Sequence, residues 1–152
     1  MKDYFKVKIN QANLLAIPIE STREVINVLK SDICPICGVN SAILGVINHR
    51  GKLLWIVELE NLLELNLNYG GEKQNKPHEK LTIIILKNQE KQIGAVVNDL
   101  KEIVSLDLDQ FELRDSNLPI KTYLNSEEIS EKILDVDAVF TALQTCVVNN
   151  KI

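Results

Sequence analysis

Apolar and polar residues alternate along much of the chain, and this pattern predicts short, half-buried strands. Phe5, Val7 and Ile9 are apolar, and lysines occupy the positions between them. A period of two residues is typical of a β-strand with one buried face. Similar apolar strips or alternating stretches predict further strands at 14–19, 25–29, 81–86, 92–97, 101–108, 120–124 and 129–134.

Residues 45–59 have the clearest pattern in the chain. An apolar strand leads into the polar tip Asn48-His49-Arg50-Gly51, and a second apolar strand follows from Leu53 to Leu59. This arrangement predicts a β-hairpin that presents one arginine at its bend. We expect Gly51 to adopt a positive φ at the turn and Gly45 to permit a close backbone approach.

Two stretches have the spacing of helices. Leu59, Leu62 and Leu63 predict a short helix, and the apolar positions between Val136 and Leu143 predict a closing helix over 135–143. Asp135 can cap the second helix by accepting hydrogen bonds from its free N–H groups. The glycine-rich, polar stretch 67–79 predicts a linker or a long exposed loop.

The element order predicts a mainly all-β protein built from two small β-barrels. Each half of the chain ends in a strand followed by an apolar helical turn, which indicates a weak internal duplication. We expect subdomain 1 at about 14–80 and subdomain 2 at about 81–136. The N-terminal strand and the C-terminal helix would pack on the pair.

Composition narrows the class of protein. Hydrophobic residues make up 45% of the chain and aromatic residues 5%, so the core must be mainly aliphatic, although the single tryptophan, Trp55, is expected to be part of it. The net charge of −4 comes from well-mixed acidic and basic residues, which argues against a nucleic-acid partner. The sequence has neither a signal-peptide pattern nor an apolar run of about 18 residues, so we expect no membrane insertion and a cytoplasmic location.

Cys34 and Cys37 form a Cys-x-x-Cys pair. A structural zinc site needs four ligands, and the two histidines, His49 and His78, do not have matching spacing. A redox pair would need its first cysteine at the start of a helix, and the residues after Cys37 do not have a helical pattern. We therefore expect no metal and no cofactor, with Cys34 and Cys37 as the candidates if a metal is bound. A small metal-binding or redox protein is the alternative function.

Several segments resemble the CheW family of chemotaxis adaptors. The hairpin resembles the family's Gly-Val-x-Asn-x-Arg-Gly stretch and the strand that follows it. Its tip, taken with Trp55, is similar to the cyanobacterial branch of PilI- and PixI-type proteins. The resemblance extends from about Tyr4 to Leu143, and its other segments are Thr22-Arg23-Glu24-Val25-Ile26, 93–103 and Ile133-Leu134-Asp135-Val136-Asp137.

The resemblance implies a single domain over 1–145 with two five-stranded SH3-like barrels, short helices and no catalytic activity. It implies an adaptor that couples the cytoplasmic tip of a methyl-accepting receptor to the regulatory domain of a CheA-type histidine kinase. Such adaptors work at receptor arrays on the inner face of the membrane, in chemotaxis, phototaxis or type IV pilus motility. The candidate protein-binding residues are Arg50, Gly51, Gly45, Asn48, His49, Thr22, Glu24 and Val25.

Three positions depart from the family pattern, and two candidate residues have two alternative roles. Glu58 and Asn98 stand where the family usually has aspartate, and Thr22 stands where valine is common. Arg50 and Glu24 could each contact a partner or only face solvent. A regulatory variant that occupies the same array position but binds a different kinase would have the same sequence pattern.

Overall fold

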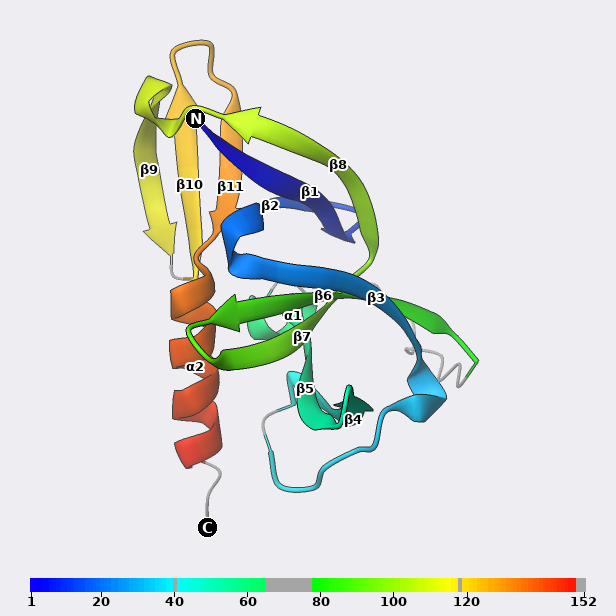
Figure 1. Ribbon diagram of the computed structural model, residues 1–152. Coiled ribbons are helices and arrows are strands. Elements are labelled where there is room, and N and C mark those ends of the chain that lie inside the picture. Colours follow the sequence, from blue (N-terminus) through cyan, green and yellow to red (C-terminus); the bar gives the residue numbers. More distant parts are fainter. Residues whose placement is uncertain (40, 65–77, 118, 150–152) are drawn as a thin grey trace.

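The computed structural model describes residues 1–39, 41–64, 78–117 and 119–149 of the 152-residue chain. Within these residues the chain forms two β-sheets, one above the other in Figure 1, and a C-terminal helix that runs beside the lower sheet. The mainly β character predicted from the alternating pattern is confirmed.

The first sheet has six strands in the order β8-β1-β2-β11-β10-β9. β1 lies between its antiparallel partners β2 and β8, and a short parallel contact between Ile133 and Ala16 joins β11 to β2. The strands are β1 (Lys2–Asn10), β2 (Asn13–Pro18), β8 (Asp99–Leu106), β9 (Phe111–Asn117), β10 (Ile120–Asn125) and β11 (Ser130–Leu134).

The second sheet has five strands in the order β3-β6-β7-β5-β4. Its neighbours are antiparallel except for β5 and β7, which run parallel. The strands are β3 (Thr22–Leu29), β4 (Ile43–His49), β5 (Lys52–Glu58), β6 (Lys80–Asn88) and β7 (Lys91–Val97).

The helices are few. α1 (Leu59–Leu62) follows β5, as the leucine spacing predicts, and α2 (Val136–Asn149) is longer than the predicted closing helix. The predicted cap is confirmed, because the Asp135 carboxylate accepts a hydrogen bond from the Ala138 N–H at 3.1 Å. The described residues also form three 3₁₀ turns: η1 (Ile19–Ser21), η2 (Lys30–Asp32) and η3 (Leu108–Gln110).

The sheets do not divide the chain near residue 80, where the sequence placed the subdomain boundary. Strands β3 to β7 are one continuous segment, 22–97, and this segment is inserted between β2 and β8. β2 therefore belongs with the C-terminal strands, and β6 and β7 belong with β3 to β5. The boundary differs because β1 pairs with β8, which is distant in sequence, and in this pairing Tyr4 lies opposite Val104. The resulting sheet has six strands, whereas five were expected.

β9 was not predicted, because it is almost wholly exposed and offers little apolar alternation. Most of the predicted linker, 67–77, lies outside the described residues.

A shared hydrophobic core joins the two sheets. It contains side chains from β1 and β2 of the first sheet, from β6 and β7 of the second sheet, and from both helices. The continuous apolar run in β6 is explained by burial on both faces. Ile84 and Leu86 enter the shared core, whereas Ile83 and Ile85 enter a smaller core within the five-stranded sheet.

Candidate functional site

The hairpin tip is a two-residue turn. His49 and Lys52 are the last paired residues of β4 and β5, and Arg50 and Gly51 form the turn with φ of 53° and 79°. Two consecutive positive φ angles are typical of a type I′ hairpin, so the positive φ predicted for Gly51 is confirmed. The Asn48 side-chain oxygen accepts a hydrogen bond from the Gly51 N–H at 3.1 Å, which fixes the bend.

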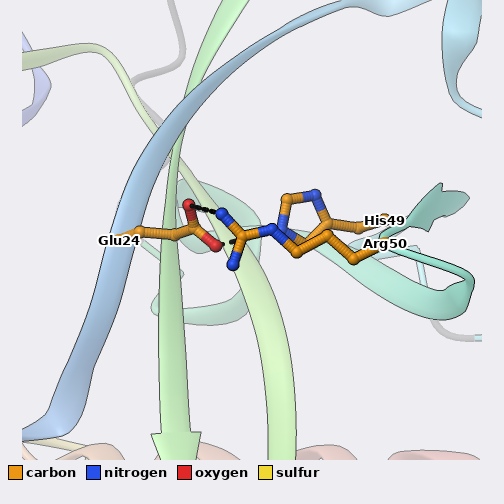
Figure 2. A network of polar contacts seen from close by, with 3 residues as sticks. All are labelled: Glu24, His49 and Arg50. Atoms are coloured by element: carbon orange, nitrogen blue, oxygen red, sulfur yellow. Dashed lines mark hydrogen bonds and ion pairs between the residues drawn. The ribbon is translucent and has the colours of Figure 1, made fainter.

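Glu24 on β3 binds two side chains of the hairpin tip. Its Oε1 accepts from Nε2 of His49 at 3.0 Å, and its Oε2 accepts from Nη2 of Arg50 at 3.1 Å, as Figure 2 shows. Because β3 and β4 are the two edge strands of the five-stranded sheet, these contacts connect opposite edges of one sheet. The five-stranded sheet is therefore curled, so that its two edges approach each other at Glu24.

The Glu24 carboxylate is stabilised in its ionised form. The hydrogen bond from His49 lowers the pKa of Glu24. The charges of Arg50 and Arg23 act in the same direction, and partial burial opposes them. The Glu24 side chain is 25% exposed, whereas that of Arg50 is 66% exposed. Most of the guanidinium of Arg50 therefore remains available to a partner.

A hollow of about 230 Å³ adjoins the hairpin tip. Three permanent cations, Arg23, Arg50 and Lys52, contribute to its wall, with one acidic residue, Glu90. The hollow is suited to an anionic group of a partner, since guanidinium groups bind carboxylates in a planar fork. Its other lining residues are His49, Leu53, Leu54 and Gln92.

An apolar strip lies next to this hollow. Leu53 and Trp55 point outward from β5, with 73% and 36% of their surfaces exposed, whereas Leu54 and Ile56 point into the core. The expectation that Trp55 is buried is therefore wrong, because strand alternation places it on the outer face. Exposed apolar side chains beside arginines are typical of protein interfaces.

Gly45 has a structural role. Its φ is 151°, and a Cβ there would lie 2.1 Å from the Cys34 carbonyl oxygen. Cys34 and Val46 exchange two backbone hydrogen bonds of 2.9 Å each beside this position. The predicted close backbone approach is confirmed: Gly45 lets the cysteine loop, residues 34–38, pair with β4 through Cys34.

The eight sequence-predicted residues do not form one surface. Glu24, His49, Arg50, Gly51 and Asn48 meet at the hairpin tip. The remaining three, Gly45, Thr22 and Val25, lie apart from these contacts, on β4 and β3.

Thr22 and Val25 have different surroundings from Glu24. The Thr22 hydroxyl donates to the Ile19 carbonyl at 2.8 Å. Val25 is exposed on the strand face opposite to Glu24.

The sequence did not single out Arg23, Lys52 or Leu53 as site residues. Their signal was the alternation of β3 and β5, which places Arg23 and Leu53 on solvent-facing positions. Recognising the hollow also required knowing that β3 and the hairpin tip meet.

The described residues form neither a metal-ligand cluster nor a membrane-spanning helix. Within 1–39, 41–64, 78–117 and 119–149, no three His, Cys, Asp or Glu side chains are grouped as a metal site would require. Cys34 and Cys37 are free and exposed. Among these same residues, none of the helices combines the length and the apolar character needed to cross a membrane.

The fold and the site define a class of protein: two small β subdomains around one core, with a cationic hollow open to solvent at a hairpin tip. The chain belongs to the CheW-like domain family, whose model matches residues 3–144. Its two subdomains are the SH3-like units of that fold.

A solved structure supports this fold. The scaffolding protein TtCheW from Thermoanaerobacter tengcongensis is similar over 88% of this chain and 83% of its own, with 19% identity and a TM-score of 0.65. No curated protein matches the chain.

Proposed function

We propose that this protein is a non-enzymatic adaptor that couples methyl-accepting receptors to a CheA-type histidine kinase. The observation that carries the proposal is the CheW-like domain, which accounts for residues 3–144. An adaptor of this kind acts only through its contacts, because holding two partners on one small body raises the effective concentration of each for the other.

The hairpin tip is the proposed contact with one partner. A carboxylate of that partner would enter the hollow and bind Arg50, while Glu24 holds the arginine in place from the other side. His49, Asn48 and Gly51 would line the same contact, and the exposed Leu53 and Trp55 would add apolar area. The opposite face of β3, with Val25, would be open to the second partner.

The cellular setting is part of the proposal. The protein would be cytoplasmic and would sit at receptor arrays on the inner face of the membrane. The tryptophan in the return strand of the hairpin favours the PilI- and PixI-type branch, with an output in chemotaxis, phototaxis or type IV pilus motility. Deleting the gene and scoring swimming, phototaxis and twitching separately tests which output applies.

A charge-swap experiment tests the role of Arg50. The kinase regulatory domain is titrated with the wild type, with Arg50→Glu and with the double variant Glu24→Arg/Arg50→Glu. The double variant restores an ion pair between the two positions but reverses the charge shown to the partner. Arg114→Glu, a charge reversal at an exposed arginine on β9, is the matched control.

We expect both variants with Glu at position 50 to bind at least about tenfold more weakly, because interface arginines are frequent hot spots. The control should bind like the wild type. Recovery of binding in the double variant would show that Arg50 serves the fold rather than the partner. No binding by the folded wild type to any CheA-type regulatory domain would contradict the adaptor function itself.

A further inference from the structure

The cysteine loop between η2 and β4 has the features of half a metal site. Every residue from Cys34 to Gly38 is exposed, and the loop lies at the end of the molecule away from the six-stranded sheet (Figure 1). Cys34 is held in place by its two backbone hydrogen bonds to Val46. Gly38, with φ of 81°, turns the chain directly after Cys37.

The two thiols have the spacing of a zinc-binding pair. Structural zinc sites take cysteines separated by two to four residues, with Zn–S distances of about 2.3 Å, so two sulfurs on one ion lie about 3.8 Å apart. Cys34 and Cys37 are separated by two residues, which is within this range, and the turn at Gly38 follows directly. Soft thiolate ligands favour Zn²⁺ over Mg²⁺ or Ca²⁺.

A second molecule can supply the remaining two ligands. A structural zinc ion is four-coordinate, and the described part of this chain brings no third ligand to the cysteine pair. His49, the histidine nearest in sequence, already uses its Nε2 to bind Glu24. A second copy of the chain offers an identical exposed pair, and a twofold axis through the metal would complete a four-cysteine site.

We propose that Cys34 and Cys37 are half of a zinc site, and that Zn²⁺ links two copies of this chain through four thiolates. Each thiol loses its proton to solvent when it binds, so one ion displaces four protons and no oxidation or reduction takes place. Ile36, an exposed apolar side chain between the two cysteines, would be covered by the second copy. The inference does not depend on the adaptor function.

The test uses the full chain, reduced with a phosphine, with Zn²⁺ added in steps or removed by EDTA. Elemental analysis gives the bound zinc, and sedimentation velocity gives the mass. We expect one zinc per two chains, a zinc-dependent dimer and its return to monomer in EDTA. Cys34→Ser and Cys37→Ser should abolish both the zinc and the dimer, and Cys146→Ser, the matched control, should abolish neither.

A second measurement does not depend on the variants folding. Co²⁺ added to the wild type should give the near-ultraviolet thiolate-to-metal absorption of a tetrahedral sulfur site, saturating at one ion per two chains. Zinc bound at one per chain without dimerisation, zinc retained by both serine variants, or no binding at micromolar metal would each overturn the proposal.

Discussion

At the scale of single residues, Glu24 joins β3 to the hairpin tip. Its carboxylate accepts from a histidine and from an arginine that are 25 and 26 positions away, and it thereby connects the two edges of one sheet. The sequence left Glu24 undecided between a partner surface and a solvated strand face. Neither alternative contained this contact, because a side-chain pair so distant in sequence leaves no local pattern.

The lowered pKa of Glu24 predicts a pH effect on stability. Since the folded value lies below the unfolded value of about 4.3, the ionised carboxylate stabilises the fold above that pH, and the contribution is lost as the pH falls through the folded value. In urea titrations between pH 3 and 5, the stability difference between wild type and Glu24→Gln should shrink as the pH falls below about 4. Glu112→Gln, an exposed control on β9, should show no such loss. A difference that is the same at every pH would contradict the role of the carboxylate charge.

Gly45 and Gly51 both have positive φ, but they should respond differently to alanine. Gly45→Ala places a Cβ 2.1 Å from a backbone oxygen, so we expect it to lower the free energy of unfolding by at least about 3 kcal/mol. A Cβ at Gly51 would have no neighbouring atom within 4 Å. Gly51→Ala should therefore lower the free energy of unfolding only by the cost of its positive φ, about 1 to 2 kcal/mol. Chemical denaturation of both variants checks the order, and equal losses would show that the Cys34 loop moves away at little cost.

At the scale of elements, hairpins with a buried face could be predicted and exposed strands could not. The β4–β5 and β6–β7 hairpins have apolar strips separated by short polar turns, so period and turn chemistry point to the same structure. β9 contributes only Phe111 and Leu113 as large apolar residues, and Leu113 is exposed. Without a core to face, this strand carries no hydrophobic period.

The cap of α2 was predictable because the aspartate directly precedes the apolar helical face. Asp135→Ala removes the acceptor of the Ala138 N–H, so we expect a loss of about 1 kcal/mol in the free energy of unfolding. Asp135→Asn keeps an acceptor and loses only the 3.5 Å ion pair with Lys121, so it should cost a few tenths of a kcal/mol. Urea denaturation of the two variants separates the cap from the charge, and equal losses would mean that the ion pair dominates.

At the scale of the whole molecule, the shared core makes the two sheets one unit. Phe140 on α2 packs in the same cluster as Val7 and Leu15 of one sheet and Ile84 of the other. The subdomain boundary could not be predicted, because it depends on the pairing of β1 with β8, two strands that are separated in sequence by the segment 22–97. Local hydrophobic patterns do not encode which distant strands pair.

We therefore expect a single unfolding transition. Trp55 reports on the five-stranded sheet, and Tyr4 and Tyr123 report on the six-stranded sheet, so their signals should change at the same denaturant concentration. Phe140→Ala should shift both signals together and cost about 3 to 5 kcal/mol. Separate midpoints for tryptophan and tyrosine would show that the sheets unfold independently.

The insertion of one sheet into the other has a consequence for biosynthesis. The hairpin β1–β2 leaves the ribosome first. The strand β8, which pairs with β1, is made roughly 80 residues later, after about 4 to 16 s of translation. Through that interval the edge of β1 that later pairs with β8 has no partner strand. Lys6 and Lys8 alternate with the apolar residues of β1, and lysines on an open strand edge disfavour its pairing with other chains.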